Sequence, residues 1–570
     1  MVCFPCPLKE QEAGSALKGL EGAAVAAIID FIEHGKHGEH GSGRTSIKVH
    51  LDRVSCFLMS AYMVTLNDRG KQHSDVKELV RDTDFNQAQS ILYRRLSANL
   101  YKTSDDRYYH IHGSLDASTT LAMLDLPTHI PHLDKYEDCL KKIGGAVAKL
   151  STAELEAMNA EHKQAGIPAL TKEEFLNTPH GRVMKSLPPF TVRRIPGSTT
   201  GPVPFPTASL PSTPGKPKQI LEGIKVLELC RVIAGPTIGR SLAALGASVL
   251  RINSPHLPDV TFFQVDVNTG KHTAFLDLKD PAQKTAFDAL LDQADVVIDG
   301  YRPGVLAKFG CSPGALAARA ARRRKGIVYV AEDCFGGTGA VVAAEGSGEG
   351  EAEAEAGAEA EDAEWAHRPG WQQIADCASG VAWEQGRFMG RDEPVVPPFP
   401  MSDYGTGCLG SVAALAGLHR RAAQGGSWAC RTSLLQYDLF LLSLGAHEMP
   451  VQDALRAAHD PAFFALRYDD SVDVVSAAAL KSMRRLHPDL FDRAALMHRA
   501  STDGFEVEKA VVEWPREAVE VEVEVEVEGD GGRGRGRGPW RIGHVRPSRA
   551  NGNDEARWGD DWERVEGLLD

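Results

Sequence analysis

The sequence predicts an α/β protein: a Rossmann-like parallel sheet with flanking helices in the central half, and a smaller α+β domain in the N-terminal third. Two observations support the sheet. Between residues 221 and 330, short apolar segments alternate with segments of helical periodicity, and parallel strands are apolar throughout because helices cover both faces. A chain of 570 residues, 43% hydrophobic and 25% charged, is also long enough for two or three domains with sizeable cores.

The central elements follow one another in a regular order. The expected strands are 224–229, 248–252, 274–278, 296–298 and 327–330. A helix is expected over 237–245. A second should begin at Pro281, with Asp280 as its cap, and run to Leu291, because proline is favoured in the first helical position.

The N-terminal third repeats part of this pattern. Residues 14–25, 45–51 and 55–64 read as helix, strand and helix, like residues 405–418, 425–435 and 438–444. The first copy has no acid at the position of Asp403; the nearest acids are Glu10 and Glu12. If the repeat is real, only the second copy has an acid at this position.

Low-complexity segments divide the chain. We predict a partial repeat with the small domain at 1–195, a proline-rich crossing linker at 196–219, a domain with the nucleophile at 220–445, and a degenerate segment at 446–570. An acidic insertion is expected at 345–364. The Val/Glu alternation within 519–538 has the period of a strand, but its simple composition and the Gly/Arg run favour disorder.

The charge pattern says little about partners. The net charge of −14 is concentrated in 345–364, which carries −9, and in 513–530, which carries −7, so the remainder is close to neutral. We therefore expect no nucleic-acid partner, although Gly/Arg repeats also occur in RNA-binding tails. No run of about 18 apolar residues and no signal peptide is visible, so we predict a cytoplasmic protein that does not enter a membrane.

Asp403 is the most informative residue of the chain. It lies within residues 401–407, Met-Ser-Asp-Tyr-Gly-Thr-Gly, directly before a buried helical pattern over 408–418. The amides of a helix start favour an ionised carboxylate, and flanking glycines let a substrate approach closely. The two interpretations are a nucleophile and an ordinary helix N-cap.

Metal sites are poorly supported. Cys3 and Cys6 form one C-x-x-C pair without a second pair, and His110 and His112 share a face of an expected strand without a third ligand. We predict no metal.

The ordered motifs resemble those of the family III CoA-transferases, which include formyl-CoA transferase, carnitine CoA-transferase and alpha-methylacyl-CoA racemase. The resemblance covers residues 221–444, through the motifs at 221–236, 245–252, 268–271, 276–279, 294–299 and 302–304 and on to Asp403. Residues 101–114 and 178–190 resemble the small domain of the same family. Residues 368–373 are similar to the long, two-half variants found in fungi, compared with which this chain starts late.

The resemblance implies a reaction. In the family the aspartate attacks an acyl-CoA thioester to give a mixed anhydride. The CoA thiolate then forms an aspartyl-CoA thioester, and an acceptor carboxylate takes the CoA. Asp403 would be the nucleophile, and Gly405 and Gly407 would supply backbone donors. CoA would be a substrate or product rather than a bound cofactor, and the partners would be an acyl-CoA and a carboxylic acid.

The resemblance also implies CoA contacts. The strand-to-helix turn would bind phosphate through its amides, and basic residues nearby would neutralise it. The residues implied are Arg231, Val232, Ala234, Gly235, Arg251, Lys271, Tyr301, Arg302 and Lys308.

Two alternatives to CoA transfer stay open at this point. One is racemase-type proton transfer, with Asp403 and a histidine such as His367 as the acid and base. The other is an inactive protein that binds CoA or a partner. Because family members form interlocked dimers, we expect a homodimer or a pseudo-dimer within one chain.

Overall fold

The structure is a computed structural model that describes residues 2–35, 45–209, 218–337, 365–503, 505–529, 532–537, 540–559 and 568–569. The acidic insertion predicted at 345–364 lies outside the described residues, as does part of the proline-rich linker. Within the described part of the chain, no helix is both long and apolar enough to cross a membrane.

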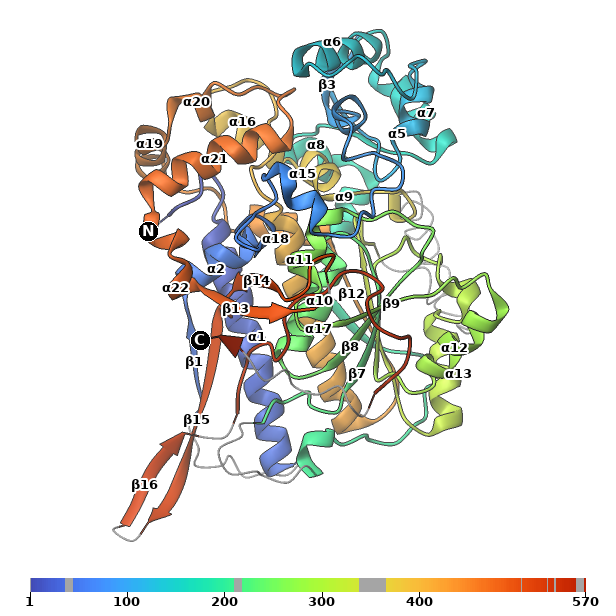
Figure 1. Ribbon diagram of the computed structural model, residues 1–570, viewed down its shortest axis with the longest axis vertical. Coiled ribbons are helices and arrows are strands. Elements are labelled where there is room, and N and C mark those ends of the chain that lie inside the picture. Colours follow the sequence, from blue (N-terminus) through green and yellow to red (C-terminus); the bar gives the residue numbers. More distant parts are fainter. Residues whose placement is uncertain are drawn as a thin grey trace.

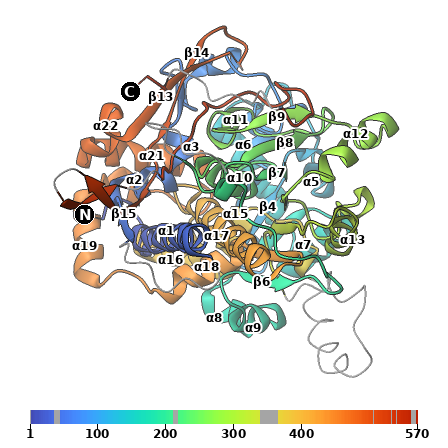
Figure 2. The same ribbon diagram turned by 90° about the horizontal axis from the view of Figure 1, so that it is seen from below.

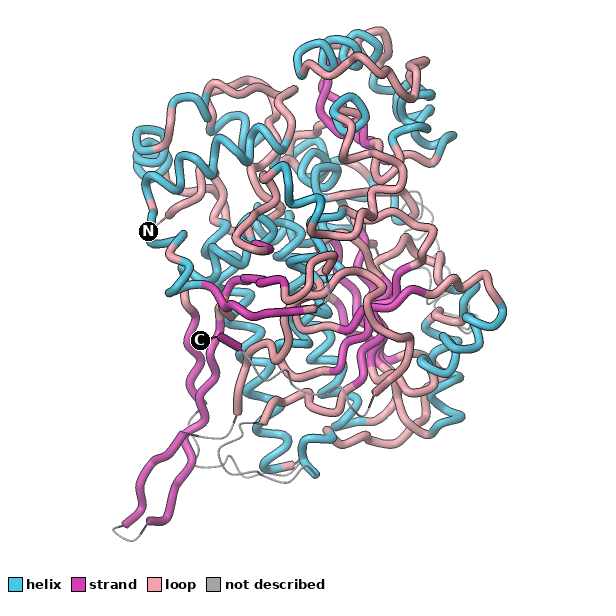
Figure 3. The backbone as a smooth tube through the Cα atoms, in the orientation of Figure 1, coloured by secondary structure: helices cyan, strands magenta, loops and turns pink. Residues whose placement is uncertain are grey.

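A seven-stranded sheet forms the centre of the molecule (Figures 1 and 3). In sheet order its strands are β6 (Thr191–Arg194), β12 (Trp428–Ser433), β11 (Val328–Asp333), β10 (Val296–Asp299), β7 (Lys225–Leu229), β8 (Ser248–Asn253) and β9 (His272–Phe275). Neighbouring strands are parallel except for β6, which runs antiparallel to β12. Each of the five strands predicted in the central half overlaps an observed one, so the predicted fold class is confirmed.

Helices cover both faces of this sheet. The helices are α10 (Ala234–Ala244) and α17 (Met401–Gln424) on one face, with α1 (Glu10–His34) packed against α17, and α12 (Pro281–Leu291) and α13 (Pro313–Arg323) on the other. Val226 belongs to the first core and its neighbour Leu227 to the second, because successive strand residues point to opposite faces. The predicted cap of α12 is confirmed: Asp280 accepts the N–H of Ala282 at 2.8 Å.

The order of the strands predicts where a ligand binds. From β7 the chain adds β8 and β9 on one side, and then adds β10, β11 and β12 on the other. In open α/β sheets, ligands bind beyond the carboxyl ends of the strands where the direction reverses. Here this point lies between β7 and β10, and is followed in the sequence by Arg231 and Tyr301.

The N-terminal third contains the small α+β domain that the sequence predicts. Three antiparallel strands pack against short helices at the top of Figure 1. They are β3 (Ala98–Lys102), β4 (Tyr108–His112) and β5 (Ala165–Pro168), with α5 (Ala117–Met123), α6 (Tyr136–Val147) and α7 (Thr152–His162).

The N-terminal and C-terminal segments share two further sheets. In one, β2 (Thr65–Leu66) pairs with β14 (Ala510–Pro515), which pairs with β13 (Met497–Thr502), and β13 pairs with β17 (Leu568–Leu569). In the other, β1 (Thr45–Val49) pairs with β15 (Val519–Gly529), and β15 with β16 (Gly532–Arg537). Val519 and Val521 are buried in the core that includes α1, so the strand period was the correct signal and the interpretation as disorder was wrong there.

Further helices connect these layers. They are α2 (Leu51–Leu58), α3 (Ser60–Met63), α4 (Leu92–Arg95), α8 (Lys172–Asn177), α9 (Pro179–Ser186), α11 (Gln264–Val267), α15 (Gln372–Ser379), α16 (Val381–Phe388), α18 (Leu434–Ser443), α19 (Met449–Ala458), α20 (Pro461–Phe464), α21 (Val472–Leu486) and α22 (Arg493–Leu496). Figure 2 shows α1 and α17 side by side below α10, so the two segments that read as a repeat in the sequence pack together.

Candidate functional site

Asp403 lies in the first turn of α17. The helix begins at Met401 after Pro400, which takes the N-cap position and makes no side-chain cap. The N-cap interpretation of Asp403 is therefore wrong. Asp403 is also not directly before the helix, because residues 401–407 are helical themselves. Its side chain is partly exposed at the wall of a cavity.

The protein raises the pKa of the Asp403 carboxyl to about 8. Burial is the larger cause, and the negative charge of Asp438 is the smaller one. We expected the amides at the start of α17 to favour the ionised form, but these two effects outweigh them. Asp403 is therefore mostly neutral at pH 7 and must lose a proton before it can act as a nucleophile.

A buried acid pair lies beside the start of α17. The hydroxyl of Ser402 lies 2.7 Å from Oδ1 of Asp438 and 3.1 Å from Oδ1 of Asp376. A serine hydroxyl carries one proton, so it can donate to only one of these oxygens, and the other carboxyl must be protonated to bond with it. In agreement, burial raises the pKa of both carboxyls. The pair holds Ser402 next to Asp403, and Asp438 alone of the two contributes a charge that raises the pKa of Asp403.

Asp403 opens into a cavity of about 370 Å³ at the carboxyl ends of the strands. This cavity is formed by the turn after β7, the loops after β10 and β11, residues 368–371, and the small domain. Its charged and polar lining includes Ser114, Asp116, Lys163, Arg231, Tyr301, Arg302, Glu332, Asp333, Arg368 and Asp403. The position is the one that the strand order predicts.

A second cavity of about 130 Å³ also reaches Asp403. Its lining shares Ser114, Val232, Ile233 and Trp371 with the first cavity, in addition to Asp403. The rings of Tyr62, Phe263 and Trp371 make much of its surface apolar, and His112, Arg95 and Asp473 add polar groups. Asp403 therefore lies where a larger, more polar cavity meets a smaller, more aromatic one.

Five of the predicted CoA contacts line the larger cavity: Arg231, Val232, Ala234, Tyr301 and Arg302. The guanidinium of Arg231 lies 5.4 Å from the ring centroid of Tyr301 and donates to the carbonyl of Pro258 at 2.9 Å. Among the described residues, no carboxylate pairs with Arg231, Arg302 or Lys163, so their charges are available to an anionic ligand.

The other predicted contacts do not reach this cavity. Gly235 lies inside α10, where an added Cβ would be 2.8 Å from Sγ of Cys230. Lys308 lies in a short 3-10 helix, η4 (Ala307–Phe309), with its ammonium 5.1 Å from the ring centroid of Phe309.

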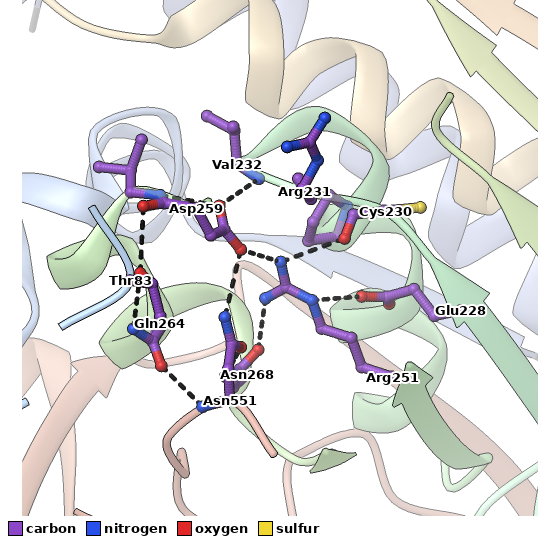
Figure 4. Close-up of polar contacts among 12 residues, drawn as sticks. Thr83, Glu228, Cys230, Arg231, Val232, Arg251, Asp259, Gln264, Asn268 and Asn551 are labelled. Carbon is purple, nitrogen blue, oxygen red and sulfur yellow. Dashed lines mark hydrogen bonds and ion pairs between the residues drawn. The ribbon is translucent and has the colours of Figure 1, made fainter. Parts of the chain in front are cut away.

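Arg251 and Lys271 are fully buried and belong to an interior ion network. Lys271 Nζ lies 2.7 Å from Oε2 of Glu228. Arg251 Nη2 lies 2.8 Å from Oδ2 of Asp259, as Figure 4 shows. Their prediction as phosphate contacts is wrong, because each charge is already neutralised inside the protein.

Gly405 and Gly407 serve packing rather than catalysis. An added Cβ at Gly405 would lie 1.9 Å from the ring of Tyr437, and one at Gly407 would lie 2.5 Å from Thr237 of α10. Both residues lie beyond the first four amides of α17, so their N–H groups belong to the helix ladder. The expectation that they donate hydrogen bonds to the reacting group is wrong.

His110 and His112 lie on β4 with their rings stacked at 5.6 Å. Burial lowers the pKa of His112 to about 3 and that of His110 well below its usual range. In the described part of the chain, no group of three or more His, Cys, Asp or Glu could hold a metal ion.

Comparison with known proteins shows the family of this chain. The model of CoA-transferase family III matches residues 221–466. The chain is 34% identical over 428 residues to acetyl-coenzyme A transferase nodX of Hypoxylon pulicicidum, covering 74% of this chain and 68% of that protein. The chain belongs to CoA-transferase family III.

Other proteins are similar over shorter segments. An acyl-CoA transferase of Gibberella moniliformis is 34% identical over 62% of this chain and 57% of its own length. The chain thus spans between half and about two thirds of the length of these two fungal relatives. The chain also matches a crystal structure of the hypothetical protein Rv3272 of Mycobacterium tuberculosis. The match is 25% identical in sequence, covers 40% of this chain and 59% of that chain, and has a TM-score of 0.31.

Sequence reasoning missed several residues that line the larger cavity. Glu332 and Asp333 end β11 at the carboxyl edge of the sheet and line the larger cavity. Their position after a predicted strand, near the reversal of strand order, was a signal that could have found them. Lys163 carried no such signal, because it comes from the small domain.

Proposed function

We propose that this chain transfers CoA from an acyl-CoA donor to a carboxylic acid through an aspartyl-CoA thioester on Asp403. The observation that supports the proposal is the position of the Asp403 carboxyl at the junction of two cavities. The larger cavity has cations for CoA that pair with no carboxylate in the described part of the chain, and the smaller has aromatic walls for the acyl group. Thioester exchange requires both groups to meet at one nucleophile.

The reaction begins with loss of the Asp403 proton. The carboxylate then attacks the thioester carbonyl, which gives a mixed anhydride and CoA thiolate. The thiolate attacks the aspartyl carbonyl and releases the first acid. An acceptor carboxylate next attacks the aspartyl thioester, and the returning thiolate takes the acyl group of the resulting anhydride, which frees Asp403. A carboxylate removed from water is a stronger nucleophile than a solvated one, so the burial that raises the pKa of Asp403 also favours attack.

The larger cavity would hold the CoA phosphates. Arg231, Arg302 and Lys163 line it without carboxylate partners among the described residues. The turn before α10 presents backbone groups at a helix N-terminus, where an anion is stabilised. The reactive thiol end of CoA would then reach Asp403.

The chain would act as its own pseudo-dimer. The small domain in the N-terminal third lines the cavity through Ser114, Asp116 and Lys163, and the domain at 220–445 supplies Asp403. The domain limits 1–195, 196–219, 220–445 and 446–570, a further homodimer and a cytoplasmic location stay predictions.

Mass spectrometry after incubation with acyl-CoA tests the proposal. We expect an adduct on the peptide that contains Asp403, removed by hydroxylamine and absent from Asp403→Asn. Exchange of the alpha proton for deuterium without an adduct would instead indicate a racemase. His367, the histidine suggested for that reaction, is exposed and lines neither cavity. Neither adduct nor exchange would indicate a protein that only binds.

A further inference from the structure

The turn between β7 and α10 contains a strained residue. Val232 has a φ of +69°, a conformation that residues with a β-branched side chain rarely adopt. It lines both cavities that meet at Asp403. A backbone in this region persists only where its surroundings hold it.

One carboxylate holds this turn (Figure 4). Oδ1 of Asp259 accepts the N–H of Val232 at 3.1 Å, and Oδ2 accepts Nη2 of Arg251 at 2.8 Å. The same Nη2 donates to the carbonyl of Cys230 at 3.3 Å. The two neighbours of Arg231 are therefore fixed, Cys230 through its carbonyl and Val232 through its backbone N–H.

Distant segments of the chain complete this arrangement. Asn551, which is 1% exposed, donates from Nδ2 to Oδ2 of Asp259 at 3.3 Å. The backbone N–H of Asn551 donates to Oε1 of Gln264 at 2.6 Å, and its side-chain Oδ1 accepts a hydrogen bond from Nδ2 of Asn268 at 3.0 Å. Thr83 Oγ1 donates to the carbonyl of Asp259 at 3.1 Å. Thr83 and Asn551 both lie outside the segment 221–466 that matches the family.

We propose that Asp259 is a positioning residue for the CoA-binding turn at 230–234, and that Asn551 of the C-terminal segment completes its hold on that turn. This inference rests on the proposed function, because it takes the turn to be part of the CoA site. A turn fixed in advance presents Arg231 and the start of α10 to the ligand without an ordering cost on binding. The C-terminal segment, which reads as degenerate in the sequence, thus supports CoA affinity.

The test uses Asn551→Ala in the full chain, because Asp259 itself neutralises the buried Arg251 and its loss endangers folding. We expect the Kd of CoA, measured by calorimetry, and the KM of the acyl-CoA to rise by about five- to tenfold, the effect of about one lost hydrogen bond. The KM of the acid and kcat at saturation should stay within about twofold.

Asn159→Ala is the matched control. Asn159 is 2% exposed and donates two side-chain hydrogen bonds, to Tyr109 and to the carbonyl of Leu155, within the small domain. Asn159→Ala should lower the thermal stability about as much as Asn551→Ala does, but it should leave the Kd of CoA within about twofold of the wild type. An equal loss of affinity in both variants would show a general effect of destabilisation and overturn the proposal.

A second substitution separates positioning from a direct contact. Glycine adopts a positive φ without strain, so in Val232→Gly the turn should keep its conformation without the hydrogen bond to Asp259. In that background the effect of Asn551→Ala on the Kd of CoA should fall below about twofold. An undiminished effect there, or an unchanged Kd in Asn551→Ala alone, overturns the inference while leaving the proposed function intact. A wild type that binds no CoA overturns both.

Discussion

Two helices of this molecule, α1 and α17, begin and end alike. Each has an acid in its first turn, Glu10 in α1 and Asp403 in α17, and each ends at a glycine with positive φ, Gly35 or Gly425. Each is followed by a strand, and the two helices pack side by side (Figure 2). The protein raises the pKa of both carboxyls to about 8, mainly through burial, and Asp438 contributes to both.

The two carboxyls differ in what they face. Glu10 is 3% exposed, accepts the hydroxyl proton of Tyr437 at 3.0 Å, and lines neither cavity at Asp403. Asp403 is partly exposed and lines both cavities. A raised pKa is therefore not enough to mark a nucleophile, because a substrate must also reach the carboxyl.

Substitution of the two acids gives the largest expected contrast. Asp403→Asn should lower kcat at least about a thousandfold, because the amide cannot form the acyl intermediate. Glu10→Gln should leave kcat within about twofold, since the neutral amide can replace a neutral carboxyl as acceptor for Tyr437. Steady-state transfer kinetics measure both. Equal losses in the two variants would remove the distinction between α1 and α17.

The pH dependence of transfer follows from the pKa of Asp403. The nucleophile is the deprotonated form, and only about 1% of a group with a pKa of about 8 is ionised at pH 6, against about half at pH 8. The rate constant kcat should thus rise by roughly 50-fold from pH 6 to pH 8 and level off above. The profile should be the same in Glu10→Gln. A flat profile between pH 6 and 8 would contradict the role given to Asp403.

The cations that line the larger cavity beside Asp403 should matter less than Asp403 itself. Arg302→Ala should raise the KM of the acyl-CoA by about tenfold, the effect of a lost charge-assisted contact, with little change in the KM of the acid. Lys308→Ala is the matched control, because this cation lies outside the cavity. A rise of the same size for Lys308→Ala would mean that general electrostatic attraction, rather than the cavity, determines affinity.

Substitution of a glycine by alanine should change the stability of the protein in opposite directions in the two helices. Gly405→Ala should destabilise the protein by about 1–3 kcal/mol, because the new Cβ would lie 1.9 Å from the Tyr437 ring. Gly19→Ala in α1 should stabilise it by about 0.5–1 kcal/mol, because the nearest atom would be 3.9 Å away and alanine favours a helix. Chemical denaturation measures both. Stabilisation by Gly405→Ala would show that α17 tolerates a looser contact with α18.

Part of the fold and site could be predicted from local patterns. The central strands were found because buried parallel strands are short and uniformly apolar, whereas β6, Thr-Val-Arg-Arg at the sheet edge, has no such signal. Arg231 and Arg302, implied by the resemblance, both line the larger cavity because each follows a strand that ends near the reversal of strand order, and their contact with CoA stays a prediction. Arg251 and Lys271 were not, because nothing local shows that Glu228 and Asp259 neutralise them.

By itself the sequence determined the parallel sheet, its order along the chain and the acid at the head of α17, since these depend on periodicity and on residues close together. Only the tertiary structure decided which acid meets a cavity, which cations pair with no carboxylate among the described residues, and that Asn551 donates to Asp259, 292 residues earlier in the chain. Burial and charge neutralisation depend on the atoms that surround a group, and folding brings these together from segments that are far apart in the chain.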